Sequence, residues 1–357
     1  MLRLLTAGES HGKGLVAILE GLPAGIRINP QFINAELKRR QSGFGRGKRM
    51  QIENDKAQIL SGVRKGITSG APLALVIENK DFSIDKLKKV ICPRPGHADL
   101  SGLLKYGFSD IRDVLERASA RSTASSVGVG AIAKIFLSEF SIKIISKVIS
   151  IAGAISPEKK IARIRLAKEK KDTVGGTFEV AARGVPVGLG SYVQSDRRLD
   201  GRLASAVMSI PGIKAVEIGL GFGYGDKFGS EVHDAIYYNR NRGYFRKTNN
   251  AGGIEGGISN GEDIIIRACM KPICTLIKPL DSVNITTNKP AKAAVERSDI
   301  CVVQAAGVVA ESATAYVLAD AMLEKFGSDA LKDIKRVYQV YLKRIKLLTA
   351  ELCTGLG

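Results

Sequence analysis

The sequence has no tryptophan, and aromatic residues make up only 6% of its 357 positions. So few aromatic side chains leave few platforms on which unpaired bases could stack, which argues against single-stranded nucleic acid as a ligand. Cysteine is also scarce, with no CxxC pair and none beside a histidine; the five are Cys92, Cys269, Cys274, Cys301 and Cys353. Neither a disulfide framework nor a zinc site is supported, so we expect reduced thiols and no bound metal.

Long apolar runs and an export signal are lacking as well. The longest uninterrupted apolar runs, such as residues 72–77, have the length of a strand, whereas a membrane-spanning helix needs about 18 residues or more. At the N-terminus, MLRLLTAGESHG meets a glutamate and a histidine before the apolar region of a signal peptide could form. We therefore expect a cytoplasmic protein without a membrane partner.

Acidic residues are too few to balance the basic ones: 54 Lys and Arg face 35 Asp and Glu, a net charge of +19. Such an excess is typical of proteins that bind nucleic acid, an acidic membrane surface, or small substrates with phosphates and carboxylates. A merely solubilising surface is the other explanation. Residues 143–171 hold nine Lys or Arg and two Glu. We interpret this segment as a solvated helical excursion; the alternative, an RNA-binding arm, would need interleaved aromatic residues, which it lacks.

The chain contains no linker rich in Pro, Ser or Gly and no repeat of fixed period, so we expect one integrated domain over residues 1–357. Short aliphatic runs bounded by turn residues predict strands at 73–77 and 263–268. Helical spacing predicts helices at 34–40, 125–139 and 312–325. The last two are apolar on most faces, which is typical of buried helices.

Buried helices among strands that do not alternate regularly with helices indicate an α+β sandwich, in which helices and sheets form layers. The C-terminal part predicts an amphipathic helix at about 329–350, which packs on its own subunit or on a neighbour's. Its apolar face consists of Leu331, Ile334, Tyr338, Tyr341, Ile345 and Leu348.

Two glycine motifs resemble nucleotide-binding loops but fail in detail. GESHGK at 8–13 is one residue shorter than a Walker loop and lacks the Ser or Thr after the lysine. Gly128, Gly130 and Ala133 fit G-x-G-x-x-A, but no buried strand precedes them and no acidic residue follows about 20 positions later. A Rossmann unit is therefore not expected.

The three histidines are His11, His97 and His233. His11 in GESHG and His97 in PRPGHAD lie between glycine and small or polar residues, as loop residues do, so each is a candidate proton donor near neutral pH. A purely structural role is the alternative for both. His233 in SEVHDA has the context of a surface or strand-end residue.

Arginine clusters indicate an anion site. Residues 38–49, KRRQSGFGRGKR, place six basic residues around a glycine turn without an acidic residue. Guanidinium groups bind carboxylates and phosphates in a bidentate manner, although a nucleic-acid loop would look similar. ERASAR at 116–121 and ERSD at 296–299 combine arginine, serine and an acid; they fit either anion binding at a helix N-terminus or ordinary capping boxes with salt bridges.

Ten segments, in order, resemble the chorismate synthase family from residue 1 to about residue 332. They are TAGESHG at 6, RRQSGFGRGKRMQIEND at 39, SGVRKGITSGAP at 61, RPGHADL at 94, ERASAR at 116, GGTFE at 175, VPVGLGSYV at 185, TNNAGGIEGGISNG at 248, MKPICTLIKPL at 270 and VERSD at 295. The resemblance implies a βαβ sandwich with helices between antiparallel sheets. It implies a lyase that removes phosphate from 5-enolpyruvylshikimate 3-phosphate by anti 1,4-elimination to give chorismate.

The resemblance also implies reduced FMN as the cofactor and associates the chain with NADPH. We expect no additional domain that could reduce flavin, so an external flavin reductase or another source of reduced flavin is implied. A homotetramer is implied too, without a nucleic-acid partner. A basic nucleic-acid-binding protein remains the alternative function, on the strength of the net charge and of the basic run at 143–171.

Residue roles follow from the same resemblance. His11 would protonate the departing phosphate, His97 would stabilise or protonate the reduced flavin, and Asp299, with Ser10 in relay, would tune flavin N5. The substrate would be bound by Arg40, Arg46, Arg49 and Arg121. The flavin would be lined by Arg117, Ala118, Ser119, Gly212, Gly256, Lys271, Pro272, Ile273, Cys274, Thr275 and Arg297, with Lys271 near its phosphate.

Two positions depart from the family pattern. Ala118 stands where a second serine is usual, which implies one flavin hydrogen bond fewer. Pro211 and Gly212 replace a more typical asparagine and alanine at a turn that contacts flavin, so Gly212 is the weakest of these assignments.

Overall fold

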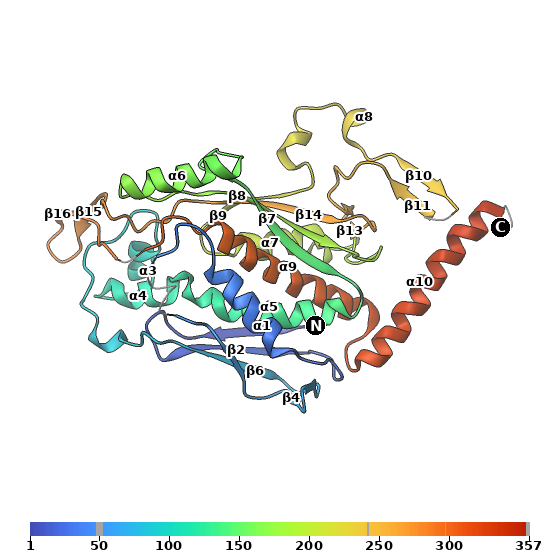
Figure 1. The fold of residues 1–357 in the computed structure, drawn as a ribbon, viewed down its shortest axis with the longest axis horizontal. Helices are drawn as coiled ribbons and strands as arrows, with labels where there is room; N and C mark the ends of the chain where they lie inside the picture. Colours follow the sequence, from blue (N-terminus) through green and yellow to red (C-terminus); the bar gives the residue numbers. More distant parts are fainter. Residues whose placement is uncertain (48–52, 241–242, 297, 355–357) are drawn as a thin grey trace.

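The computed structural model describes residues 1–47, 53–240, 243–296 and 298–354, with side chains up to Leu347 (Figure 1). Two four-stranded antiparallel sheets enclose a layer of helices, in the strand orders β1-β2-β6-β3 and β7-β8-β14-β9. The strands are β1 Arg3–Ala7, β2 Gly14–Glu20, β3 Ala57–Ile59, β6 Leu73–Glu78, β7 Lys143–Ile151, β8 Gly176–Arg183, β9 Ile213–Ile218 and β14 Ile264–Met270. The α+β sandwich with antiparallel sheets is confirmed.

Each sheet turns an apolar face to the helical layer because its strands alternate in polarity. In β6, Leu73, Leu75 and Ile77 are buried, and β14 buries Ile264 and Ile266 in the same way. Both strands fall where the aliphatic runs predicted them. One continuous apolar core connects the two sheets.

The helical layer consists mainly of α5 (Thr123–Ser138), against the first sheet, and α9 (Val303–Phe326), against the second. Both predicted buried helices are confirmed, although α9 starts well before residue 312. Gly130 of α5 faces Ser312 of α9 so closely that a Cβ at Gly130 would lie 2.2 Å from the serine Cβ. The glycines that imitate a nucleotide motif therefore serve helix packing. The predicted helix at 34–40 lies within α1 (Pro30–Gln41), which begins with Asn29 as N-cap.

By length and composition α9 could cross a membrane, which a search for uninterrupted apolar runs did not reveal. Its most apolar window is 83% buried inside the protein, and it carries the fully buried Glu311. A helix buried on all sides is apolar all round for that reason alone. We therefore assign α9 to the core of the sandwich.

The interpretation of residues 143–171 as a helical excursion is wrong for its first part. Residues 143–151 form β7, an edge strand that pairs with β8, and only α6 (Pro157–Glu169) is helical. Ile144 is buried, whereas Lys143 is exposed and the Lys147 side chain reaches Glu179 at 2.8 Å. β7 holds only two lysines, Lys143 and Lys147, and the other seven basic residues of the segment lie at 159–171, so the composition of the whole segment concealed the strand.

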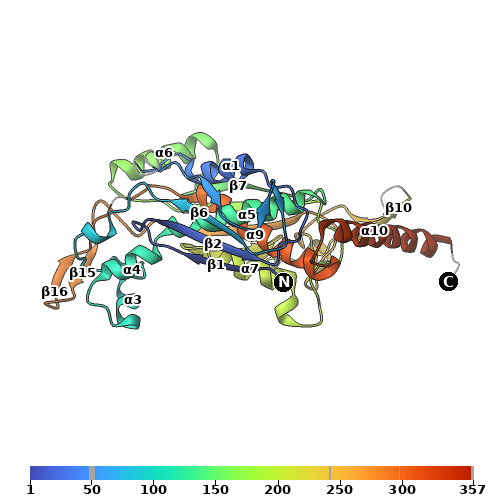
Figure 2. The ribbon, with the colours of Figure 1, turned by 90° about the horizontal axis from the view of Figure 1, so that it is seen from below.

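Smaller elements occupy the two ends of the sandwich in both views (Figures 1 and 2). At one end lie α3, α4 and the β15–β16 hairpin; at the other, the β10–β11 hairpin and α10 project from the body. The predicted C-terminal helix corresponds to α10 (Leu331–Thr354). The remaining elements are α3 Asp99–Tyr106, α4 Ile111–Ala118, α7 Leu199–Met208, α8 Gly229–Val232, β4 Val63–Arg64, β5 Ile67–Thr68, β10 Ile236–Asn239, β11 Gly243–Arg246, β12 Ile254–Glu255, β13 Ile258–Ser259, β15 Asp281–Asn284 and β16 Lys289–Lys292.

Candidate active site

The turn between β1 and β2, residues 8–13, carries His11 and is held in one conformation. Gly8 has a φ of 109°, and a Cβ there would lie 2.3 Å from the Gly14 carbonyl oxygen, so only glycine fits. Asn79, directly after β6, donates its side-chain amide to three carbonyl oxygens of this turn at 2.8 to 3.3 Å. The position of His11 is therefore fixed by the first sheet.

His11 is paired with Glu116 of α4. Its Nδ1 lies 2.9 and 3.0 Å from the two carboxylate oxygens, and its backbone N–H donates to the same carboxylate at 2.7 Å. Burial would raise the pKa of Glu116, but the hydrogen bonds from His11 outweigh burial and hold that pKa below its usual value. The carboxylate is therefore ionised, and the other ring nitrogen, Nε2, is not used by this pair.

Two buried arginines, Arg40 and Arg121, share the carboxylate of Asp55. Arg121 donates to one oxygen at 2.6 Å and Arg40 to the other at 3.3 Å, while Asn79 accepts from Nε of Arg121 at 2.8 Å. Burial lowers the pKa of Arg40 to about 10 despite the attraction of Asp55, so the side chain stays cationic at neutral pH. The Nη2 atom of Arg121 is buried without a hydrogen-bond partner in the described residues, and the Glu53 carboxylate lies 3.7 Å from it as a second negative charge.

Arg46 and its neighbour Gly47 meet Asp299, which lies 252 positions after Gly47. Nη1 of Arg46 lies 3.4 Å from one Asp299 oxygen, and the N–H of Gly47 donates to the other at 2.5 Å. Burial lowers the pKa of Arg46, although Asp299 opposes this effect. The two remaining arginines expected here, Arg49 and Arg297, lie outside the described residues.

His97 has its own acidic partner, Asp99, at the start of α3. Nδ1 of His97 lies 2.5 Å from one Asp99 oxygen, and Arg94 donates to both oxygens at 2.8 and 2.9 Å. Burial would raise the pKa of Asp99, but the hydrogen bonds from Arg94 and His97 hold it well below its usual range. Arg94 also donates to the hydroxyl of the buried Thr275 at 2.7 Å.

The segment Lys271–Thr275 therefore lies against the loop that carries His97. Besides the contact of Thr275, Nζ of Lys271 and Sγ of Cys274 both hydrogen-bond to the carbonyl oxygen of Gly96. Gly96 has a φ of 78°, which turns its carbonyl group toward this segment at no steric cost. The structure thus brings His97 together with most of the expected flavin segment.

Three of the residues expected to line the flavin, Arg117, Ala118 and Ser119, lie near the turn that carries His11. The Ser119 hydroxyl donates to the Ser10 hydroxyl at 3.2 Å. Arg117 is exposed and reaches two carbonyl oxygens at the end of β1 at 3.2 and 3.4 Å. Ala118 packs on a small apolar cluster that includes Val90.

The other residues expected to line the flavin lie in two separate places. Gly212 accepts a hydrogen bond from the backbone N–H of Lys271 at 2.9 Å, and Pro272 and Ile273 continue the same segment. Gly256 instead lies exposed in the turn between β12 and β13, which precedes β14, whereas Lys271 follows β14. Within this chain Gly256 and Lys271 lie at opposite ends of that strand.

Sequence reasoning missed the residues that hold the two histidines and the arginines in place: Asn79, Asp55, Arg94, Asp99 and Glu116. A signal existed for two of them, because Arg94 and Asp99 flank His97 in RPGHAD. Glu116 was noticed only as part of ERASAR. Its partner His11 lies 105 positions away, and no local pattern could connect the two.

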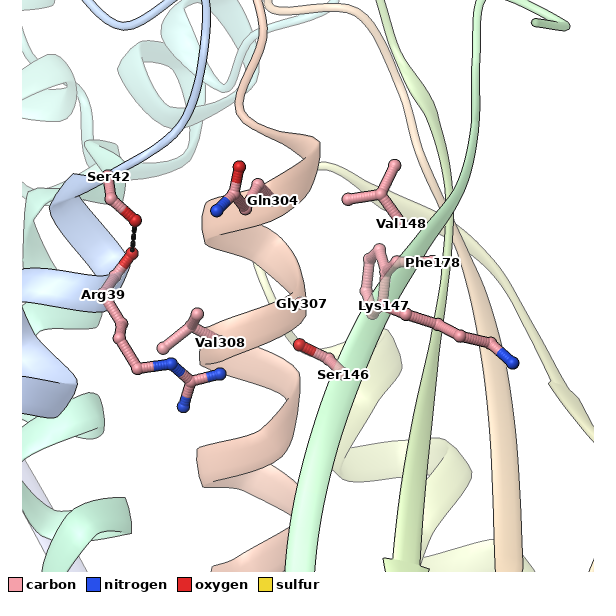
Figure 3. Close-up of a pocket in the computed structure, with 9 residues that line it drawn as sticks. All are labelled: Arg39, Ser42, Ser146, Lys147, Val148, Phe178, Gln304, Gly307 and Val308. Carbon is pink, nitrogen blue, oxygen red and sulfur yellow. Dashed lines mark hydrogen bonds between the residues drawn. The ribbon is translucent and has the colours of Figure 1, made fainter. Parts of the chain in front are cut away.

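Among the cavities formed by the described residues, two adjoin the helical layer, and neither of these is lined by His11, His97 or Lys271. The smaller, of about 190 Å³, lies between α1, α9 and β7 (Figure 3). Arg39 points its guanidinium group toward α9 there, where it is already paired with Glu36 and Glu311. The larger, of about 260 Å³, adjoins Arg46 and Cys301. Within the described ranges no group of three His, Cys, Asp or Glu side chains could hold a metal ion.

Comparison with known proteins supports one family. The family model for chorismate synthase matches residues 2–323. The chorismate synthase of Thermoanaerobacter pseudethanolicus is 56% identical over 97% of this chain and 99% of its own length, and that of Geobacter sulfurreducens is 51% identical over 97% and 100%. A solved structure described as a crystal structure of chorismate synthase superposes with a TM-score of 0.80 at 44% identity, over 97% of this chain and 98% of the other. The chain belongs to the chorismate synthase family and is a chorismate-forming lyase of the shikimate pathway.

Proposed function

We propose that this chain eliminates phosphate from 5-enolpyruvylshikimate 3-phosphate with reduced FMN bound beside the substrate. The observation that carries the proposal is the pair of histidines, each with Nδ1 on a carboxylate and each next to arginines. A substrate with two carboxylates and a phosphate requires such a concentration of positive charge. Membership in the family supplies the reaction; the chain's own residues supply the roles below.

The residues around Lys271–Thr275 fit an FMN phosphate and ring. The segment offers an amine, a hydroxyl and backbone N–H groups next to the Arg94 guanidinium group, which together are donors for an anion. When bound, reduced FMN would supply the electron-rich ring that removes a substrate hydrogen. We assign the binding to Lys271–Thr275, Gly212, Ser119, Arg117, Ala118, Gly256 and Arg297. Gly256 would have to reach the flavin from another subunit, because its turn is remote from Lys271.

The arginines and His11 would bind the substrate and perform the acid chemistry. Arg40, Arg46, Arg49 and Arg121 would bind the phosphate and carboxylates and keep the substrate in one orientation. His11 would donate a proton to the departing phosphate, which lowers the cost of expelling a multiply charged group. His97 would stabilise the flavin anion. Asp299 and Ser10 would act on the flavin N5 side.

We further propose that the protein works in the cytoplasm as one integrated domain that forms a homotetramer. It would receive reduced FMN from an external flavin reductase, with NADPH as the original reductant. Nucleic acid and membrane are not expected partners. The amphipathic α10, which projects from the body, is a candidate for contact with a neighbouring subunit (Figure 2).

An anaerobic assay with dithionite-reduced FMN tests the proposal. The purified chain and 5-enolpyruvylshikimate 3-phosphate should give chorismate and phosphate in equal amounts, without stoichiometric oxidation of the flavin. Activity with oxidised FMN alone, or consumption of one flavin per turnover, would contradict it.

Replacing Arg46 by alanine should raise the KM for substrate by about tenfold, because one charge-assisted contact is lost from an enclosed cluster. Initial rates at varied substrate concentration measure the effect. Arg267→Ala is a matched control, since Arg267 pairs with Glu179 in the second sheet. A KM equal to that of the unaltered protein would show that Arg46 serves something other than substrate.

Lys271→Ala should raise the dissociation constant of reduced FMN by about tenfold and leave the single-turnover rate at saturating flavin nearly unchanged. A contact with a phosphate is equally present in the ground state and the transition state, so its loss weakens binding uniformly. Asp299→Asn should do the opposite: a slower turnover with flavin affinity within a few-fold. If the two variants exchanged these effects, the proposed placement of the flavin would be reversed.

A further inference from the structure

We propose that Glu116 is the positioning residue that holds a hydrogen on Nδ1 of His11, so that Nε2 is the nitrogen that donates in the acid role. The inference rests on the proposed function of His11 and extends it to a residue that acts through His11. It is carried by a geometry in which one buried carboxylate binds both the ring and the backbone of the same histidine. The glutamate side chain is 2% exposed and the histidine side chain 13%.

The contact fixes which ring nitrogen can deliver the proton. A carboxylate is only an acceptor when ionised, so Nδ1 of His11 must carry a hydrogen in this pair. In the neutral ring Nε2 then carries no hydrogen, and in the protonated ring Nε2 carries the second hydrogen. Only the protonated ring can act as an acid, and only from Nε2.

The proton balance of the step follows from this arrangement. The N–H bond at Nε2 breaks, its hydrogen goes to an oxygen of the departing phosphate, and the electron pair remains on Nε2. Nδ1 keeps its hydrogen and its bond to Glu116 throughout.

The charges around Glu116 keep it ionised. On its own helix, Arg112 lies 3.8 Å away, four residues earlier on the same face. Behind Arg112, Glu296 from the segment before Asp299 pairs with Nη2 at 2.7 Å. From the 8–13 turn, the His11 ring and backbone face the same carboxylate. The Arg112 contact thus connects the two sequence segments ERASAR and ERSD.

The arrangement is more than a tether for the turn, because Asn79 already holds the turn by three hydrogen bonds. A backbone tether needs only one acceptor oxygen, whereas here both oxygens also reach the imidazole. A glutamine at position 116 could replace the tether but not the charge. This difference separates a structural role from control of protonation.

Glu116→Gln is therefore the informative variant. A glutamine can present either its oxygen or its NH₂ group to Nδ1, so the hydrogen is no longer held there, and we expect the turnover number to fall by about tenfold or more. The KM for substrate and the reduced-FMN affinity should stay within a few-fold. Glu179→Gln is the matched control: Glu179 is also a buried carboxylate, paired with Lys147 and Arg267 in the second sheet. It should leave the turnover number unchanged.

A measurement on the unaltered protein makes the inference independent of how Glu116→Gln folds. With ¹⁵N-labelled histidine, the neutral His11 ring should carry its hydrogen on Nδ1; His97→Gln and His233→Gln assign the signals. A neutral ring with the hydrogen on Nε2, or an unchanged turnover number in a folded Glu116→Gln, would overturn the inference. The proposed function fails in a different way, either when the unaltered protein forms no chorismate or when His11→Ala retains the full rate and profile.

Discussion

Replacing His11 by alanine should lower the turnover number by about 100-fold or more, which is the usual contribution of a general acid. The departing phosphate would then leave without receiving a proton and would carry its full negative charge, which makes its expulsion more costly. Reduced-FMN affinity should stay near that of the unaltered protein, because the expected flavin phosphate site lies on the Lys271 segment. Steady-state rates at saturating flavin and a flavin titration measure the two quantities.

His233→Ala provides the control for this experiment. His233 is exposed at the end of α8, outside the two histidine clusters, so its removal should leave the rate unchanged. An unaltered rate of His11→Ala at every pH would remove His11 from the mechanism. A large loss of flavin affinity instead of rate would make His11 a binding residue.

The layers of the fold could be predicted because they follow from local patterns. Short aliphatic runs predicted β6 and β14, and helical segments that are apolar on most faces predicted α5 and α9. The edge strand β7 was missed because its residues were grouped with the basic stretch that follows it. Only Lys143 and Lys147 of β7 are charged, and the basic residues of α6 and of the turn after it suggested a solvated helix over the whole segment.

Of the candidate site, the histidines and arginines could be predicted from the sequence, and the residues that hold them in place could not. The few histidines in glycine-rich loops, and the arginines without acidic residues nearby in the sequence, could be recognised as candidates from the sequence. Their partners do not, because Asp55, Asn79 and Glu116 are ordinary polar residues until the fold buries them beside a charge. Pairings such as Arg46 with Asp299 join segments that only the complete sandwich brings together.

A second group of buried charges lies outside the candidate site. Glu311 of α9 is fully buried and accepts from Lys134 of α5 at 2.5 Å, from Arg39 of α1 at 2.7 Å and from Ser146 of β7 at 2.5 Å. Glu36 completes the group at 2.5 Å from Lys134. Two carboxylates thus balance two cations at the junction of three helices and a strand. Arg39 also anchors the last turn of α1, where the next residue is the proposed substrate ligand Arg40.

Glu311→Ala should therefore lower the free energy of unfolding by about 3 to 5 kcal/mol, since Lys134 and Arg39 must then share one carboxylate, Glu36, and one positive charge of the group is no longer balanced. Chemical denaturation at neutral pH measures the loss. Glu20→Ala is the control: it removes one partner of the exposed Arg3 pair, so it should cost at most about 1 kcal/mol. Glu311→Leu combined with Lys134→Met should recover much of the loss, because the remaining Arg39 and Glu36 still neutralise each other.

The pH dependence of the same variant identifies the cause of the loss. Burial would raise the pKa of Glu311, but Arg39, Lys134 and Ser146 outweigh burial and hold that pKa below its usual value. A carboxylate with a lowered pKa in the folded state stabilises the fold at neutral pH, and this contribution disappears as the pH falls through the folded-state pKa. The difference in unfolding free energy between the unaltered protein and Glu311→Ala should therefore shrink on acidification. A difference that stays constant down to that range would mean that the variant loses packing volume and not a charge.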